Sequence, residues 1–386
     1  MALDFDIIIF GGGIAGLWLG NVLVRKGYNA IVVEKDKLGG GQTLASQGMI
    51  HGGQKYQIQN VMALQADVAA KMPERWEACI EGRGEIDLTG VRVLSPTQVM
   101  WPAGSFLSSA GVWLGTKRLS LRSIKLQPAD FPEALRLRKN FKGPVYELPE
   151  AVVDVESLIR LMAANLQGRV FQGEISELSR DGKVMVSDQK LHAQLIIFTA
   201  GTGNELALEL LHVNERRAQR RPLRQIMVRP LPYQLFGHGI VASPQPRVTV
   251  TSHACGNGEY VWYLGGALAE QGATLDEGPA LAHAKNELKE IFPQIDWDQK
   301  EWATWLGDRA EPYNDKGRLP PGPFVERHDR VLIAWPTKLT FAPALSDRVL
   351  QQLAGISPMA KSLPPPLPLA TVASYPWGIA SWRNLG

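Results

Sequence analysis

The chain has 386 residues, of which 45% are hydrophobic and 20% are charged, and its formal net charge is +3. This composition is typical of a globular protein, the length allows two domains, and the near balance of charges gives no reason to expect nucleic-acid binding. No apolar run reaches the roughly 18 residues that suggest a membrane-spanning helix. The two cysteines, Cys79 and Cys255, exclude a disulfide framework and a four-cysteine zinc site. The acidic first residues do not resemble a secretory signal, so we expect a cytoplasmic protein. We also expect no metal site.

The first 34 residues follow the order strand, glycine turn, helix, strand and acid. Residues 6–10 are a short apolar run, which predicts a strand buried on both faces. The turn Gly11-Gly12-Gly13-Ile14-Ala15-Gly16 follows, and a helical stretch then leads to a second apolar strand that ends at Glu34. The first glycine of the turn allows its tight geometry, the third allows a pyrophosphate to approach, and the sixth allows helix and strand to pack closely. The helix N-terminus would bind phosphate, and the carboxylate of Glu34 would accept hydrogen bonds from ribose hydroxyls. This pattern predicts a dinucleotide site without separating FAD from NAD.

Four later segments favour a long, extended cofactor. Residues 38–53 are rich in glycine and in small hydroxyl or amide side chains, so their backbone can run along such a molecule. Residues 195–198 predict a buried strand, which leads into the small residues Ala200 and Gly201. Asp154 is a suitable N-cap for a helix to about residue 166. Residues 331–335 predict another strand, and we expect a helix from residue 341 to about 353 with Pro343 in its first turn.

These motifs, in this order, resemble the FAD-dependent oxidoreductases of the D-amino-acid oxidase superfamily. That group includes glycine and sarcosine oxidases, glycerol-3-phosphate dehydrogenases and 2-hydroxyglutarate oxidases. The resemblance also rests on residues 305–312, 317–322 and 339–343. It implies an α/β fold: a Rossmann-like FAD-binding domain with a parallel sheet, and an α+β substrate domain with a mixed, largely antiparallel sheet. We expect the FAD-binding domain at 1–80, 145–205 and 321–360, the substrate domain at 81–144 and 206–320, and a Pro-rich docking tail at 361–386.

The resemblance also implies which residues contact FAD, position by position. They belong to the glycine turn, the end of the second strand, the loop after it, the strand that follows Gly173, the second small-residue turn and the segment before the last helix. The residues are Gly11, Gly13, Ile14, Ala15, Gly16, Glu34, Lys35, Gln42, Thr43, Ala45, Ser46, Gln47, Gly48, Ile175, Ala200, Gly201, Leu339 and Thr340.

Two positions depart from the patterns of related flavoproteins. The segment that begins at Gln42 is similar to a loop of succinate dehydrogenase flavoproteins, in which a histidine at that place bonds covalently to FAD. Glutamine lacks this chemistry, so we expect non-covalent FAD. Lys338 stands where the resemblance implies a small residue. It either approaches the N1/C2 oxygen edge of the flavin or is a solvated lysine at a strand end. A cation at that edge favours the reduced anionic form of the flavin.

The expected reaction is oxidation of a small polar, anionic substrate, an amine, amino acid or 2-hydroxy acid, by hydride transfer to flavin N5. The electrons would pass to O2 or another acceptor. Arg309 aligns with an arginine that often binds a substrate carboxylate in the amine oxidases, although an interdomain salt bridge is the alternative. His51 ends the glycine-rich loop, and an imidazole can act as a base or bind the substrate, although a structural role is equally open.

Other interpretations remain open. The chain has no second strand–glycine–helix fingerprint, so the alternatives are an FAD-dependent monooxygenase or reductase that uses an external donor, or a flavin-binding scaffold without turnover. The strands that carry His253 and Tyr263 could turn these side chains toward the flavin or away from it. The arginines between residues 216 and 224 form either a solvated face or a surface that attracts an anion. The Pro-rich tail is expected to be extended, with Tyr375, Trp377 and Trp382 docked on the protein.

Overall fold

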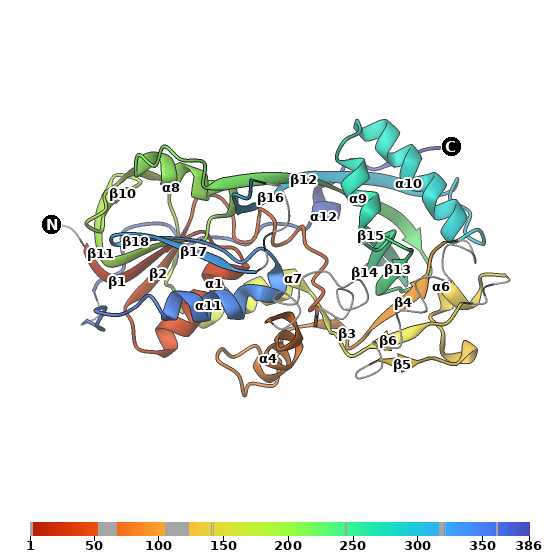
Figure 1. Cartoon of the computed structure of the whole chain (residues 1–386), viewed down its shortest axis with the longest axis horizontal. Coiled ribbons are helices and arrows are strands. Elements are labelled where there is room, and N and C mark those ends of the chain that lie inside the picture. Colours follow the sequence, from red (N-terminus) through yellow and green to blue (C-terminus); the bar gives the residue numbers. More distant parts are fainter. Residues whose placement is uncertain are drawn as a thin grey trace.

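The computed structural model describes residues 3–52, 68–104, 123–139, 141, 143–243, 245–315, 320, 322–359 and 362–386. The chain forms two sheets that lie side by side along the longest axis of the molecule (Figure 1). The two long strands β12 (Ala218–Leu231) and β16 (Glu301–Pro312) belong to the second sheet and reach toward the first, and they are hydrogen-bonded to each other over most of their length. Across the described part of the chain, every helix is too short or too polar to span a lipid bilayer.

The first sheet has a parallel centre, as the apolar runs of the sequence predict. Its order is β17-β18-β11-β1-β2-β8, and the five strands from β18 to β8 are parallel neighbours. The hairpin of β9 and β10 adds antiparallel strands to β11. The bounds are β1 Leu3–Phe10, β2 Ala30–Glu34, β8 Val170–Gln172, β9 Ile175–Leu178, β10 Lys183–Val186, β11 Gln189–Phe198, β17 Phe324–His328 and β18 Val331–Trp335.

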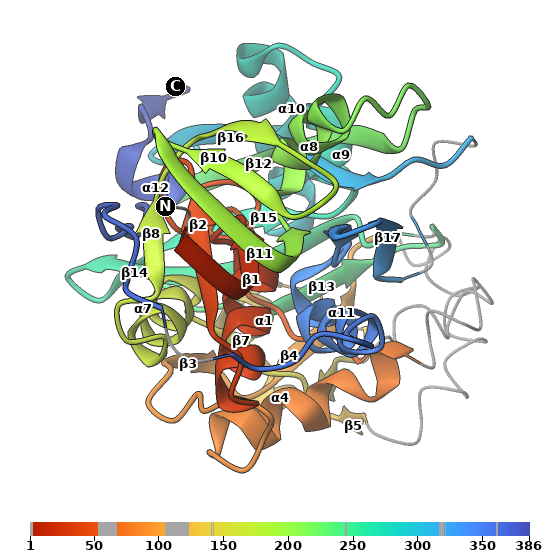
Figure 2. The same cartoon turned by 90° about the vertical axis from the view of Figure 1, so that its left-hand side faces the viewer.

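Helices cover both faces of this sheet (Figure 2). On one face, α1 (Ile14–Arg25), α7 (Val155–Asn165) and α11 (Ala342–Leu350) pack against the inward side chains of β1, among them Ile7 and Ile9. On the other face, α8 (Asn204–Leu210) and the β9–β10 hairpin pack against Phe5, Ile8 and Phe10. Burial on both faces explains why β1 is apolar at consecutive positions instead of alternating.

The second sheet is antiparallel except where β13 pairs with β4. Its order is β19-β16-β12-β15-β14-β13-β4-β6-β5, and α9 and α10 cover one face through a core that includes Trp262 and Trp302. A short ladder of β3 and β7 stands apart. The bounds are β3 Val93–Ser95, β4 Gln98–Pro102, β5 Ile124–Lys125, β6 Tyr146–Leu148, β7 Val152–Val153, β13 Gly237–Ile240, β14 Val248–Gly256, β15 Glu259–Gly265 and β19 Arg383–Asn384, with helices α4 Met72–Ile80, α6 Glu133–Arg136, α9 Ala267–Gly272 and α10 Glu277–Ile291. The α/β fold class, a parallel sheet beside a largely antiparallel one, is confirmed.

The end of the chain connects the two sheets. Thr371 and Ala373 exchange backbone hydrogen bonds with Leu38, next to the first sheet. Trp377 and Trp382 then pack against the face of the second sheet that the helices leave open, and β19 pairs with β16. The prediction of a wholly extended tail was wrong at α12 (Pro376–Ile379), because Pro376 is well suited to begin a helical turn.

Two helix ends test the sequence predictions. The side chain of Asp154 accepts a hydrogen bond from Ser157 N at 2.8 Å, which confirms it as the N-cap of α7. The last helix starts with Pro343 in its first turn as expected, but it ends at Leu350 and a 3-10 turn, Leu339–Phe341, precedes it. The tighter turn completes the change of direction after β18.

Candidate functional site

The carboxyl ends of the parallel strands bring distant segments of the chain to one edge of the first sheet. Gly11 follows β1, Thr199 follows β11, and the segment from Pro336 to Thr340 follows β18. In open parallel sheets this edge is where ligands bind.

The glycine turn at this edge is closely packed. Gly11 has φ of +105°, and a Cβ on it would lie 2.6 Å from the Cα of Ala200. A Cβ on Gly16 would overlap the carbonyl oxygen of Gly11, which explains the glycine there. Gly13 caps α1 without a side chain, and the next backbone N–H, that of Ile14, donates to Thr43 Oγ1 at 3.1 Å. The positive end of α1, with Ala15 buried in its first turn, therefore points toward the loop that contains Thr43.

The acid after β2 is held by the same turn. Glu34 Oε2 accepts a hydrogen bond from Gly12 N at 2.6 Å, and Oε1 accepts one from Asp36 N at 3.1 Å. Burial raises the pKa of Glu34 above its usual value, although both backbone hydrogen bonds act in the opposite direction. The backbone N–H of Gly173 donates to the carbonyl of Glu34, which brings the start of β9, Ile175, beside this acid. Lys35 points into solvent and pairs with Glu174 at 2.8 Å.

The loop from Gln42 to Gly48 is hydrogen-bonded to the second sheet and, through Thr43, to the start of α1. Gln42 Oε1 accepts a hydrogen bond from Ala310 N of β16 at 3.1 Å, and the Ala45 carbonyl accepts one from the Tyr263 hydroxyl of β15 at 2.8 Å. Ser46 Oγ is buried and has no hydrogen-bond partner among the described residues. Gly48 has φ of +66°, and a Cβ there would overlap the carbonyl oxygen of Val153.

His51 and Thr340 meet at the end of this loop. The His51 backbone N–H donates to Thr340 Oγ1 at 3.2 Å, and that hydroxyl donates to Met49 O at 3.2 Å. Trp76 Nε1 of α4 donates to the carbonyl of Thr340 at 3.0 Å. Leu339 is half-buried against the core under α1. Residues separated by almost 300 positions thus form one rim of the edge.

A buried polar group that the sequence analysis missed lies next to His51. The Nδ1 of His51 is 3.9 Å from Glu150 Oε2, and Glu150, only 3% exposed, accepts a hydrogen bond from Gly52 N at 2.6 Å. The ring of His238 is centred 5.5 Å from that of His51, and its Nε2 is 3.0 Å from Gln98 Oε1. No spacing motif marks Glu150 or His238, because both are distant from His51 in the sequence. Glu150 is brought near by the pairing of Met49 and Ile50 with residues 151–152, and His238 lies on β13 of the second sheet.

Comparison with known proteins identifies the chain. A family profile described as FAD dependent oxidoreductase, DAO, matches residues 6–356. The chain belongs to this family. The sequence is 41% identical over 387 residues to the probable FAD-dependent oxidoreductase PA4991 of Pseudomonas aeruginosa, covering 98% of this chain and 99% of the other. The crystal structure of that protein is similar with a TM-score of 0.85, at 39% identity and the same coverage.

Solved structures of more distant sequence share the fold. Glycine oxidase from Geobacillus kaustophilus has a TM-score of 0.65 at 15% identity, over 97% of this chain and 100% of the other. L-amino acid deaminase from Proteus vulgaris has a TM-score of 0.66 at 16% identity, over 94% and 92%. The resemblance inferred from the sequence is confirmed, and the protein is an FAD-dependent oxidoreductase.

The residues at the sheet edge fit FAD. The N-terminus of α1, where Gly13 supplies no capping side chain, can bind a pyrophosphate, and the Glu34 carboxylate can accept hydrogen bonds from ribose hydroxyls without releasing Gly12. The buried, unpartnered Ser46 hydroxyl lies where the backbone is expected to follow the cofactor. Gly201 (φ +61°) continues the small-residue turn after Ala200. A Cβ added to Gly201 would lie 3.7 Å from Oε1 of Gln42.

The side chain of Gln47 points to the second sheet. Its Nε2 donates to the carbonyls of Tyr263 at 2.9 Å and Thr249 at 3.3 Å, and its Oε1 accepts from Thr249 Oγ1 at 2.5 Å. The side chain therefore binds the second sheet, and only the backbone of Gln47 remains for a cofactor along the loop.

Arg309 and Lys338 lie on different segments of the site. Arg309, on β16, donates from Nη1 to Glu270 Oε1 of α9 at 2.8 Å, and its Nε is buried without a partner among the described residues. The salt bridge is thus formed within the second sheet and its covering helix. Lys338 is half-buried, with Nζ 5.2 Å from the centre of the Phe341 ring.

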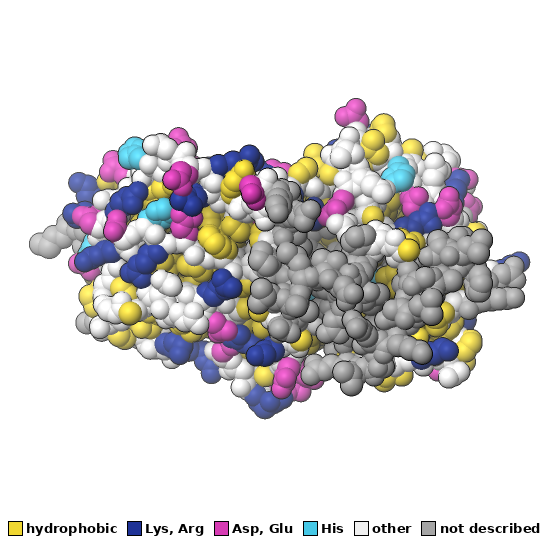
Figure 3. All heavy atoms as spheres, viewed as in Figure 1, with side chains coloured by type: hydrophobic (Ala, Val, Ile, Leu, Met, Phe, Trp, Pro, Cys, Tyr) yellow, Lys and Arg dark blue, Asp and Glu magenta, His cyan; other side chains and the backbone are white. Residues whose placement is uncertain are grey.

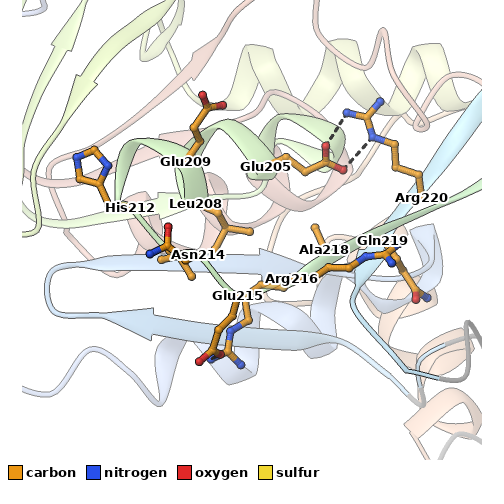
Figure 4. Close-up of a pocket in the computed structure, with 12 residues that line it drawn as sticks. Glu205, Leu208, Glu209, His212, Asn214, Glu215, Arg216, Ala218, Gln219 and Arg220 are labelled. Carbon is orange, nitrogen blue, oxygen red and sulfur yellow. Dashed lines mark hydrogen bonds and ion pairs between the residues drawn. The ribbon is translucent and has the colours of Figure 1, made fainter.

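The arginines from 216 to 224 are mostly neutralised. Arg220 pairs with Glu205, and Arg221 forms two hydrogen bonds with Glu311 at 2.7 Å. A groove of 710 Å³ lies between α8 and the start of β12, and its walls carry both charges (Figure 4). Figure 3 likewise shows basic and acidic side chains mixed over this end of the molecule. The interpretation as a solvated, ion-paired face is favoured over an anion-attracting surface.

The structure also decides the orientation of His253 and Tyr263. Both are buried on the open face of the second sheet, where Trp377 lies 4.0 Å from His253 and 5.2 Å from Tyr263, measured between ring centres. Complete burial lowers the pKa of His253 to about 3 and raises the pKa of Tyr263 well above its usual value. Tyr263 reaches the 42–48 loop, whereas His253 serves the packing of the tail.

Proposed function

We propose that this protein oxidises a small polar, anionic substrate, an amine, amino acid or 2-hydroxy acid, and passes the electrons to O2 or another acceptor. Bound FAD would supply the hydride acceptor, its N5 atom. The observation that carries this proposal is the convergence of His51 and Thr340, joined at 3.2 Å, at the edge where FAD is expected. We also propose that FAD is held without a covalent bond, because Gln42 offers no nucleophile, and that the protein is cytoplasmic.

His51 is assigned the role of base. Its Nδ1 lies toward the buried carboxylate of Glu150, which can orient the ring and stabilise the imidazolium that forms when Nε2 accepts a proton. The backbone of His51 is fixed by Thr340, so the ring has a defined position relative to the segment after β18.

Arg309 is assigned the anionic end of the substrate. Its buried Nε–H has no acceptor among the described residues, so a carboxylate could bind there while Nη1 keeps its bond to Glu270. Lys338 is assigned to the flavin edge, because it lies between β18 and the turn that contains Thr340.

The test is anaerobic reduction of the purified yellow protein by amino acids, N-methyl amino acids, 2-hydroxy acids and glycerol phosphate. Bleaching by one group supports the proposal and names the bond that is oxidised. Reduction only by NAD(P)H would instead support a monooxygenase or reductase, and tight FAD with no reductant would support a scaffold.

The role of His51 is tested with His51→Asn, which should slow flavin reduction by about a hundredfold, the low end of general-base effects. His192→Asn is the matched control, since His192 is a partly exposed histidine paired with Asp4 near the amino ends of β1 and β11, opposite the carboxyl edge. Equal rates in the two variants would remove His51 from the mechanism.

A further inference from the structure

Three side-chain oxygens converge above Gly265, at the end of β15. A Cβ on Gly265 would lie 2.6 Å from Gln47 Oε1, 2.6 Å from Thr249 Oγ1 and 3.2 Å from Gln225 Oε1. These side chains come from the 42–48 loop, from β14 and from β12, so the group is assembled only in the folded protein. We refer to Gln47, Thr249 and Gln225 as the acceptor cluster.

The cluster has spare acceptors and no spare hydroxyl hydrogen. Thr249 already donates its hydroxyl hydrogen to Gln47 Oε1, and the Gln47 amide donates to two backbone carbonyls. Gln225 is 4% exposed, and its Oε1 is buried and accepts no hydrogen bond from any described residue. A buried acceptor without a donor costs free energy, so its presence needs an explanation such as a ligand.

The position of the cluster relates it to the proposed reaction. Tyr263, two residues before Gly265, donates its hydroxyl hydrogen to the Ala45 carbonyl, so this side of the second sheet faces the loop expected to follow FAD. On β16, Trp305 is paired with Gln225, and a Cβ on Gly307 would overlap the Trp305 ring. The indole therefore extends over Gly307 in the direction of Arg309.

The acceptor cluster and the Arg309 guanidinium are separated along β16. Four residues of strand place the Cα atoms of Trp305 and Arg309 about 13 Å apart, and the length of the arginine side chain can reduce the gap between the functional groups. An apolar surface, the Trp305 ring, lies between the acceptor cluster and the guanidinium.

We propose that Gln225 determines substrate specificity: with Gln47 and Thr249 it accepts the N–H hydrogens of an amine whose anionic group reaches Arg309 across Trp305. The assignment rests on the proposed function, and it selects the amine from the substrates left open there. A substrate hydroxyl has one hydrogen for these oxygens, whereas a protonated primary amine has three, so a hydroxy acid leaves buried acceptors unsatisfied. The expected ligand is an amine with several carbons between nitrogen and carboxylate.

The experiment compares matched ligands that differ only in N–H and O–H. Glycine and glycolate, 4-aminobutyrate and 4-hydroxybutyrate, and 6-aminohexanoate and 6-hydroxyhexanoate are titrated into the oxidised holoenzyme without oxygen, and binding is followed by the change in flavin absorbance. We expect the amine to bind at least tenfold more tightly than its hydroxy partner, with the preference lost in Gln225→Leu and retained in Gln225→Glu, which keeps an acceptor oxygen.

Thermal unfolding gives a second measurement that needs no ligand. Leucine at position 225 removes an unsatisfied acceptor, so the melting temperature should rise or stay unchanged. Gln219→Leu is the matched control on the same strand, because Gln219 is buried but accepts from Asn314 N at 3.1 Å and donates to Glu311, so its loss should lower the melting temperature.

Each outcome decides the proposal. Equal binding of amine and hydroxy partners, no binding of any amine, or a preference that survives in Gln225→Leu would overturn it. So would a fall in melting temperature as large as that of Gln219→Leu, because Gln225 would then be structural. Selective amine binding without flavin reduction would support the subsite and reject the proposed oxidation.

Discussion

The hydrogen bond from Tyr263 to the Ala45 carbonyl is the connection between the second sheet and the 42–48 loop that can be removed most selectively. Tyr263 is 0% exposed and its hydroxyl lies 2.8 Å from the carbonyl oxygen. Replacement by Phe keeps the ring and its packing against Trp377, and it removes only the donor. Because burial raises the pKa of Tyr263 well above its usual value, the hydroxyl stays protonated and the effect should not vary between pH 6 and pH 9.

The magnitude follows from what the carbonyl loses. A typical hydrogen bond contributes about 1 kcal/mol net, and a buried acceptor deprived of its donor costs about 1–3 kcal/mol. We expect the loss to be shared between the folded state and the binding of FAD, since the same loop is proposed to contact the cofactor. We expect the melting temperature to fall by about 1–2 °C, because the unfolding entropy of a chain of 386 residues is about 0.8 kcal/mol/K. The dissociation constant of FAD should rise roughly tenfold, which corresponds to about 1.4 kcal/mol.

The assay titrates FAD into the apoprotein and follows the quenching of flavin fluorescence, with thermal unfolding measured in parallel. Tyr260→Phe is the matched control, because Tyr260 lies on the same strand but packs against the core beneath α9 and α10. If Tyr263→Phe binds FAD as tightly as the control variant and unfolds at the same temperature, the hydrogen bond does not hold the loop.

Three further predictions concern the cofactor acid, the tail and the buried histidine. Glu34→Gln replaces the charge-assisted bond to Gly12 N by a weaker neutral one, so the dissociation constant of FAD should rise about tenfold in the same titration, and an unchanged value would contradict the role of Glu34. Trp377→Ala should lower the free energy of unfolding by about 2 kcal/mol in denaturant unfolding, less than the loss of a fully buried tryptophan. Ile379→Ala, at a side chain that is 73% exposed, should leave the free energy of unfolding unchanged. Equal effects of the two changes would reject docking of the tail. Burial lowers the pKa of His253 in the folded protein to about 3, below the ordinary value of 6.5. The neutral ring therefore contributes its full stability above pH 6.5, and this contribution is lost as the pH falls, by about 2 kcal/mol at pH 5. The fall in melting temperature between pH 7.5 and pH 5 should be smaller in His253→Gln than in the wild type, and an equal fall would show that His253 is not buried as a neutral ring.

The parts of the fold that depend on local pattern were predictable. Residues 6–34 predicted a strand, a turn, a helix and a strand, because burial on both faces requires an apolar run and the close approach of Gly16 to Gly11 excludes any Cβ. Asp154 was predictable as an N-cap since its carboxylate satisfies an N–H three residues away. Such contacts lie within a few residues of each other, and the side-chain chemistry alone determines them.

The surroundings of the proposed reactive groups were not predictable in the same way. Glu150 is adjacent to no motif, yet it lies 3.9 Å from His51, and Arg309 has Glu270 as its partner rather than a residue of the first sheet. Gln47 was expected in the loop along the cofactor, and its side chain binds Thr249, more than 200 residues away, which no local pattern indicated. These contacts depend on which distant segments of the chain pair with each other and in which register.

The sequence by itself determined the family, the cofactor and the edge of the first sheet at which FAD is expected, because glycine turns and buried parallel strands impose strict local requirements. The tertiary structure decided which side chains of the second sheet face that edge. A shift of one residue in strand register reverses the face to which every side chain points, and the register of β12, β14 and β15 is set by burial against distant helices and the tail. The orientation of Gln225, Tyr263 and His253 is therefore a property of the assembled sheet.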